Sequence, residues 1–402
     1  MKQSISSNKR SGFDTLFEWL FMSGIFLLSV FFIPFTAVPF QFTKVLFIAI
    51  VALLGAAFFV VGRMKDRVLS FPKSPLLGAL LLVPFAYFLS SIFSGNVILS
   101  LFGRNIPTDS FVFIALVVLI CTLIVLGVRS KEGMFRMYIS FMVSFAVVSL
   151  YQLSRLLFGP DFLSFGILTS ETSSLVGSWN DLAIFYGLTL ILSLVTFVGL
   201  SLEGFIKWFI SGVLGVSLFF LAVINFSTVW WIVGTFALAT FVYSLTTNTY
   251  SRRSSQDDSF TEERERLFPR ENTISFASLL VLAISLIFIT GGSFVGNIIS
   301  SIFNVSQVEI RPSWQATVDI ARNTYSENAI FGSGPGSFST QWRQYKPQGI
   351  NQTQFWGVDF NSSIGFIPTS MITTGAVGVV AWMLFLGMFL YAGFRALVAR
   401  AT

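Results

Sequence analysis

Long apolar runs constrain the fold of this chain more than any other feature of its sequence. Each run has about the 20 residues that an α-helix needs to cross a bilayer. They fall at 16–35, 43–62, 76–93, 110–128, 135–157, 181–200, 208–225, 229–245, 274–290 and 376–394. Only helices and closed barrels satisfy their backbone groups in lipid, and these runs lack the alternation of barrel strands. We therefore expect an all-α, polytopic transmembrane helical bundle of about 10 spans.

Composition supports a membrane protein and excludes sites that depend on histidine or on disulfide bonds. Of the 402 residues, 54% are hydrophobic and only 11% are charged, which lies outside the range of soluble globular domains. The chain has no histidine, so it lacks the usual general base near neutral pH and the commonest zinc ligand. Cys121 is the only cysteine, so no disulfide framework is possible within the chain. We expect neither a metal ion nor a cofactor.

Charge placement predicts the topology. Basic turns at 63–67 and 129–133 fall on alternate loops, whereas the loop at 159–179 carries no Lys or Arg. By the positive-inside rule the basic turns are cytoplasmic, and with ten spans both chain ends are cytoplasmic as well. The segment 246–273 mixes five arginines with six acidic residues and lacks core-forming residues, which predicts a flexible cytoplasmic loop.

Three regions follow from this topology. Residues 1–290 are predicted to hold the first nine transmembrane helices, and residues 364–402 the final transmembrane helix and a cytoplasmic end. Between them, 291–363 is predicted to be a large, partly helical extracytoplasmic loop. Its stretch 309–361 is the longest polar segment of the chain, so a chemical function is most reasonably placed there.

The first part of this stretch predicts an amphipathic helix followed by a tight turn. Pro312 can open the helix at its first position, and a guanidinium at Arg311 beside free N–H groups can face an anion such as phosphate. Arg311 can equally anchor the helix end or pair with Glu309. The helix would place Trp314, Val318, Ala321 and Tyr325 on one face and Gln315, Asp319 and Arg322 beside it. FGSGPGSF at 331–338 predicts a structural turn, since it lacks the Lys and the strand-to-helix context of a phosphate loop.

The second part of the stretch combines aromatic and polar side chains. Trp342 and Trp356, with Trp314 before them, are candidate sugar or loop contacts, because apolar sugar faces stack on aromatic rings. A belt of aromatic residues at the membrane interface explains the same pattern. Asp359 lies nearest the return into the membrane, where partial burial would make its carboxylate a stronger base. A capping or ion-paired aspartate is the alternative.

The chain resembles a known family in its topology over most of its length, and in three motifs. The first is GSWNDLAIFYGLTL at 177–190, which leads from a loop into a helix. The second is Arg311 with Trp314, at the head of a helix that runs into FGSGPGSF. The third is FNSSIGFIPTSMITTGAVGVVAW at 360–382, where an asparagine precedes a helix and the next span. Together they resemble the bacterial O-antigen ligases and the related polymerases.

The resemblance implies a helical glycosyltransferase of the GT-C kind in the bacterial inner membrane. Such enzymes move a saccharide from an undecaprenyl-pyrophosphate-linked glycan donor to a hydroxyl of a lipid or glycan acceptor, during cell-surface polysaccharide assembly. No nucleic acid takes part. The departing pyrophosphate needs cationic donors, and the acceptor hydroxyl needs orientation or a base. Arg311 matches the family's pyrophosphate contact, and Asn361 matches the asparagine of its third motif.

Two positions depart from the family pattern. Thr228 stands where the family has a second arginine, and Phe360 stands where it has a histidine. We therefore predict that Asp359 takes the basic role beside Asn361, and that Arg322 or Arg343 supplies the missing cation. The alternatives are a non-catalytic relative that acts as a glycan- or lipid-binding scaffold, and a transporter. A transporter would show charged or broken helices near mid-membrane and inverted repeats, neither of which is clear in this sequence.

Overall fold

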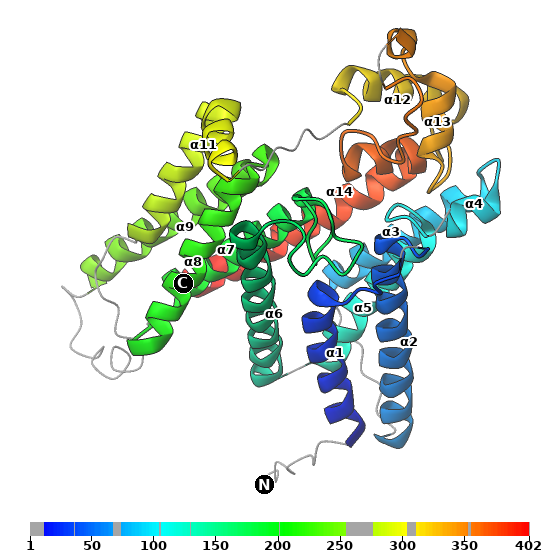
Figure 1. The fold of residues 1–402 in the computed structure, drawn as a ribbon. Helices are drawn as coiled ribbons and strands as arrows, with labels where there is room; N and C mark the ends of the chain where they lie inside the picture. Colours follow the sequence, from blue (N-terminus) through cyan, green and yellow to red (C-terminus); the bar gives the residue numbers. More distant parts are fainter. Residues whose placement is uncertain are drawn as a thin grey trace. The chain divides into compact units, whose positions relative to one another are not determined.

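The computed structural model describes residues 12–35, 37–66, 74–103, 106–128, 130–200, 202–254, 276–303, 311–352 and 355–401. Within these residues all regular secondary structure is helical, as the sequence predicts (Figure 1). The chain divides into two compact units. The first unit comprises 1–33, 37–140 and 309–402, and the second comprises 34–36 and 141–308. Each unit is described by itself.

The helices follow the apolar runs closely, and each predicted span falls on one of them. Their bounds are α1 Gly12–Val30, α2 Phe40–Asp66, α3 Pro75–Ile92, α4 Val97–Phe102, α5 Phe111–Gly127, α6 Lys131–Phe158, α7 Trp179–Gly199, α8 Gly204–Ile224, α9 Ser227–Ser254, α11 Phe276–Ile302, α12 Trp314–Asn328, α13 Phe338–Tyr345, the 3-10 helix η1 Gln348–Gln352 and α14 Phe366–Ala401.

Eight of the described helices are long and apolar enough to cross a membrane. They are α1, α2, α3, α6, α7, α8, α9 and α14. Two shorter apolar helices, Phe111–Gly127 and Phe276–Gly292, coincide with the two remaining predicted spans. The membrane class and the all-α fold are thereby confirmed, while the count of ten spans stays a prediction.

Two apolar cores hold the membrane helices of the first unit together. Helices α1, α2 and α5 pack around Phe17, Phe21 and Leu123. Helices α3 and α14 pack side by side, and their contact includes a buried polar bond from the Tyr87 hydroxyl to Ser370 Oγ at 2.7 Å. Inside an apolar bundle such a bond satisfies both hydroxyl groups, which would be costly to bury alone.

Helix α14 bends at Gly375, whose φ of 61° breaks the helical hydrogen bonding. The turn 329–334 lies against this bend and restores the missing bonds in both directions. The N–H groups of Ser333 and Gly334 donate to the carbonyls of Ile372 (3.3 Å) and Thr373 (2.8 Å), and those of Ala376 and Val377 donate to Ala329 (3.0 Å) and Ile330 (3.1 Å). A broken helix is tolerated in a membrane protein where other groups satisfy its backbone in this way. The bend therefore fixes the polar loop to the end of α14.

In the second unit, helices α7, α8, α9 and α11 pack through stacked aromatic rings. Tyr186 stacks on Phe220 at 4.6 Å, and Trp230 stacks on Phe288 at 4.3 Å. Helix α11 continues past the predicted loop start at 291 to Ile302, with a bend at Gly292 whose φ is 46°.

The helical bounds also refine one other predicted segment. Helix α9 extends to Ser254, so the first residues of the segment 246–273 are helical. The remainder of that segment lies outside the described residues.

Candidate functional site

A polar pocket of about 310 Å³ lies in the first unit, beside the ends of its membrane helices. Its walls come from α4, the turn before α5, the glycine-rich turn with α13, and the segment before α14. The pocket is lined by Leu99, Pro107, Asp109, Gly336, Ser339, Thr340, Arg343, Asp359 and Asn361.

Asp109 is the buried charge of this pocket. A turn that places Ser110 as the N-cap of α5 sets its position, because both the N–H and the hydroxyl of Ser110 donate to the Pro107 carbonyl, at 2.9 and 2.7 Å. Only 4% of Asp109 is exposed, and its Oδ2 accepts the N–H of Gly336 at 3.2 Å. Burial raises the pKa of Asp109 to about 6, against the opposing effect of hydrogen bonds from its own N–H and that of Gly336.

Gly336 reaches Asp109 because the glycine-rich turn adopts conformations that other residues rarely take. Gly332, Gly334 and Gly336 have φ values of 66°, 96° and 69°. A Cβ on Gly334 would lie 2.3 Å from Ser100 Oγ, so the turn also packs tightly against α4. The turn is structural, as the sequence indicates, and it delivers an N–H group to a carboxylate.

Helix α13 provides one wall of the pocket through its amphipathic pattern. Ser339, Thr340 and Arg343 line the pocket, at the spacings that place side chains on one helix face. The opposite face buries Phe338, Gln341 and Trp342 against α12 and α14. The buried face holds the polar face in place.

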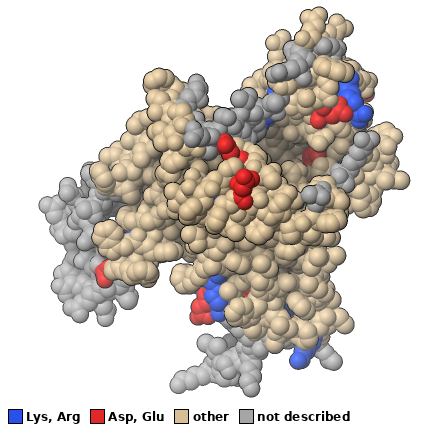
Figure 2. Space-filling view, in the orientation of Figure 1, with Lys and Arg blue, Asp and Glu red and all other residues tan. Residues whose placement is uncertain are grey.

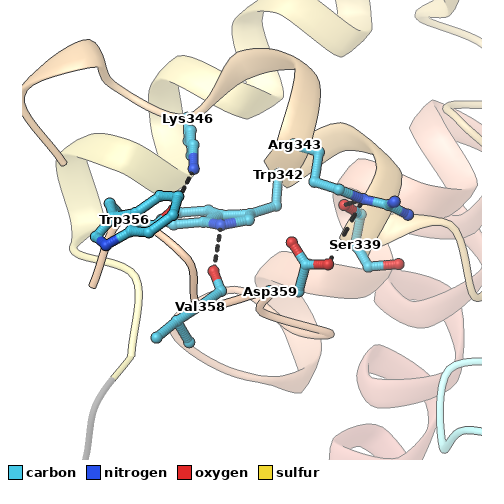
Figure 3. A network of polar contacts seen from close by, with 7 residues as sticks. All are labelled: Ser339, Trp342, Arg343, Lys346, Trp356, Val358 and Asp359. Atoms are coloured by element: carbon cyan, nitrogen blue, oxygen red, sulfur yellow. Dashed lines mark hydrogen bonds and ion pairs between the residues drawn. The ribbon is translucent and has the colours of Figure 1, made fainter. Parts of the chain in front are cut away.

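The segment that carries Asp359 is attached to α13 at two points (Figure 3). Trp342 Nε1 donates to the Val358 carbonyl at 3.0 Å, and Lys346 Nζ donates to the Trp356 carbonyl at 2.7 Å. These bonds keep the carboxylate of Asp359 beside α13 although the segment has no regular structure.

Arg343 and Asp359 form an ion pair at the rim of the pocket. Arg343 Nε lies 3.8 Å from Asp359 Oδ2 and also donates to the Ser339 carbonyl at 3.3 Å (Figure 3). The two side chains are 49% and 59% exposed, so the pair contributes little to stability. Partial burial was expected to make Asp359 a stronger base, but its side chain is exposed. The buried carboxylate of the site is Asp109.

The structure brings three of the predicted site residues together and leaves the others apart. Arg343, Asp359 and Asn361 line the pocket. Arg311 does not line it, and its Nη1 donates to the Ile364 carbonyl at 3.0 Å, which links the start of α12 to the start of α14. Arg322 lies exposed on α12 outside the pocket lining.

The three tryptophans predicted as sugar or loop contacts lie in different environments. Trp342 is fully buried and belongs to the core of the loop region, so it is a loop contact rather than a surface for sugar. Trp314 and Trp356 are 64% and 65% exposed. Neither lines the pocket, and both remain available for a sugar ring or a membrane interface.

The buried face of α12 is not the face that carries Trp314, Val318, Ala321 and Tyr325. The helix begins as expected, but Ser313 is the N-cap and its Oγ accepts the N–H of Ala316, so Pro312 lies just before the helix. The buried residues are Ala316, Thr317, Ile320 and Thr324. Because these side chains are small or β-branched, the helix can approach α13 and α14 closely, whereas the larger Trp314 remains exposed.

Residues of the first and third motifs have structural roles here. Phe360 packs edge-on against Trp342 with ring centroids 4.8 Å apart. In the second unit, Ser178 and Asp181 of the first motif form a capping box at the start of α7. Thr228 lies exposed in the first turn of α9.

Sequence reasoning missed Asp109, Ser339 and Thr340. Asp109 belongs to a polar loop between two spans, and only the fold brings it to Gly336. The helical spacing of Ser339, Thr340 and Arg343 was visible, but nothing in the sequence showed which face of α13 is buried.

Charged side chains are sparse. Figure 2 shows blue and red side chains over α13 and at the lower ends of α2 and α6. Within the described residues no group of three or more His, Cys, Asp and Glu side chains is arranged to hold a metal ion.

Fold and site together define a polytopic membrane protein with a polar pocket at the ends of its apolar helices. Comparison of the sequence with protein-family models and with curated proteins finds no match.

Proposed function

We propose that this chain is a membrane glycosyltransferase that moves a saccharide from undecaprenyl pyrophosphate to an acceptor hydroxyl in cell-surface polysaccharide assembly. The pocket carries this proposal, because carboxylate, amide, hydroxyl and guanidinium groups line one cavity beside the ends of apolar helices. The motifs that resemble the O-antigen ligases support the same reaction, on the outer side of the bacterial inner membrane.

The proposed reaction needs a proton acceptor. The acceptor oxygen bonds to the anomeric carbon while the bond from that carbon to the pyrophosphate oxygen breaks, and the hydroxyl proton passes to a carboxylate and then to water. Asp359 is the base that the sequence suggests. Asp109 is the stronger candidate, because its pKa of about 6 leaves it ionised at neutral pH yet more basic than an ordinary aspartate.

The pyrophosphate needs positive charge. Arg311, Arg322 and Arg343 are the contacts that the sequence suggests, and Arg311 is the one that the family resemblance favours. Its bond to the Ile364 carbonyl places the guanidinium at the start of α12, where the helix dipole also favours an anion. Arg311→Ala is expected to weaken binding of undecaprenyl pyrophosphate about tenfold or more. Unchanged binding would make this arginine purely structural.

The direct test is transfer by the full chain in lipid vesicles. A labelled undecaprenyl-pyrophosphate-linked glycan is supplied with lipid or glycan acceptors, and the label is expected to move to the acceptor. Asp109→Asn is expected to lower the rate at least a hundredfold, the usual minimum contribution of a general base. Asp359→Asn tests the other carboxylate, and retained transfer in that variant would remove it as the base. Arg395→Gln, on an exposed position of α14, is the matched control.

The alternatives give different results in the same vesicles. A glycan- or lipid-binding scaffold binds the donor without moving the label. A transporter moves the label across the bilayer while it remains on the original carrier. Either result, with a donor that is shown to bind, overturns the transferase proposal.

A further inference from the structure

The charges around the pocket do not suit a pyrophosphate. Two carboxylates, Asp109 and Asp359, line it together with one guanidinium, Arg343, which lies 3.8 Å from Asp359. When Asp109 is ionised, the net charge of these three groups is negative. An anion with two or more negative charges would be repelled by Asp109 at close range in a partly dehydrated pocket.

The hydrogen-bonding groups suit a hydroxylated, uncharged ligand. A carboxylate such as Asp109 accepts hydrogen bonds from hydroxyl groups, and Asn361 offers both a donor and an acceptor. Ser339 and Thr340 offer hydroxyl groups from the polar face of α13, and all of these residues line the pocket. A sugar ring carries several hydroxyl groups, each of which is both donor and acceptor.

The pocket also has the shape and the rigidity that such a ligand needs. Its volume of about 310 Å³ lies at the small end of ligand pockets, which suits about one or two sugar rings. Pro107 and Leu99 add apolar surface on which a ring face can lie. Asp109 is fixed before binding, because Gly336 donates to its Oδ2. Its side chain therefore loses little conformational freedom when a ligand binds.

We propose that this pocket is a saccharide subsite, in which Asp109 and Asn361 bind the hydroxyl groups of an uncharged sugar ring, and that the pyrophosphate of the donor is bound outside it. The inference rests on the proposed function and deepens it. It assigns Arg343 to orienting Asp359 at the pocket rim and leaves Arg311 and Arg322 as the cationic contacts.

The test is binding by the purified full chain in nanodiscs, measured by saturation-transfer NMR and titration calorimetry. The probes are a panel of methyl glycosides of neutral hexoses and N-acetylhexosamines, with inorganic pyrophosphate as the anionic comparison. At least one glycoside is expected to bind, with affinity reduced at least tenfold in Asp109→Asn and in Asn361→Ala. Asp319→Asn, on α12 and outside the pocket lining, is the control that should bind as the parent does.

The melting temperature of each variant shows whether it folds. Asn361 is exposed, so Asn361→Ala should fold as the parent does, and a loss of glycoside binding in this variant then reports the lost contact. The inference is overturned if no glycoside binds, if both pocket variants bind the glycosides normally, or if pyrophosphate displaces the bound glycoside from the parent protein. Glycoside binding without transfer overturns the transferase alone. Transfer that persists at the parent rate in both pocket variants overturns the saccharide subsite and Asp109 as the base, while the transferase proposal stands.

Discussion

Gly332 and Gly375 approach so closely that neither position can carry a side chain. A Cβ on Gly332 would lie 2.6 Å from the Gly375 nitrogen, and a Cβ on Gly375 would lie 2.5 Å from the Gly332 nitrogen. Both residues also have positive φ values, 66° and 61°. The glycine-rich turn and the bend of α14 therefore form one structural feature, and the pocket depends on it because Gly336 lies four residues further along the turn.

Alanine at either glycine is expected to destabilise the protein. Gly332→Ala and Gly375→Ala each force a Cβ against backbone atoms in an unfavourable conformation, which costs about 2–4 kcal/mol. The measurement is the melting temperature in detergent together with glycoside binding, both of which should fall. Gly387→Ala, also in α14 but with open space around its Cβ position, is the control and should melt at or slightly above the parent temperature. An equal fall in melting temperature for all three variants would contradict the close approach of Gly332 and Gly375.

Ser90 should also be needed to keep the turn on the membrane helices. Its Oγ bonds to the carbonyls of Phe331 (2.6 Å) and Thr373 (3.1 Å), one from the turn and one from α14. Ser90→Ala leaves these buried carbonyls with fewer donors and is expected to cost about 1–3 kcal/mol. Hydrogen exchange at Gly334 and Ala376, which bond across the same contact, should quicken. Ser326→Ala, on an exposed position of α12, should change neither quantity.

The sequence predicted the fold class and the positions of the membrane helices because lipid permits few solutions. An apolar run of sufficient length must be a helix when no water is present to satisfy its backbone. The bend at Gly375 was not predicted, since a glycine within an apolar run is compatible with a straight helix. Only the long-range bonds from residues 329–334 make the bent form stable.

The site was predicted less well, for reasons visible in two residues. Asp359 was singled out by its place near the membrane, but the irregular segment that carries it leaves it exposed. Asp109 was overlooked because its burial depends on a turn more than two hundred residues away in the chain. Charge type and local spacing can be read from a sequence, whereas desolvation depends on contacts between distant segments.

Trp342 should stabilise the segment that carries Asp359. Its indole Nε1 bonds to Val358 and its ring packs on Phe360, so Trp342→Phe keeps most of the apolar contact but removes the donor. We expect a loss of about 1–2 kcal/mol and faster hydrogen exchange in the segment 355–361. The same change at the exposed Trp314 should leave stability within about 0.5 kcal/mol of the parent. Comparable losses in the two variants would contradict the assignment of Trp342 to the core.

Neutralising Asp109 should change how stability depends on pH. Because burial raises the pKa of Asp109 to about 6 from its ordinary 3.8, the folded protein retains a proton there between about pH 4 and pH 6 that the unfolded chain releases. This group therefore favours the folded state fully below about pH 4, and that contribution is lost as the pH rises through 6. The loss amounts to about 3 kcal/mol, since each unit of pKa is worth about 1.4 kcal/mol.

Asp109→Asn removes this loss while its amide oxygen can still accept the N–H of Gly336. The variant should therefore be more stable than the parent above pH 7, and the difference should shrink towards pH 4. Arg343 and Asp359 line the same pocket and are retained in both proteins, so their own effects cancel in the comparison. Asn361→Ala removes a polar pocket side chain without removing a titratable group, and its stability difference from the parent should not vary with pH. Melting temperatures from pH 4 to pH 8 provide the measurement. A difference for Asp109→Asn that is independent of pH would show that Asp109 is not held in a desolvated site.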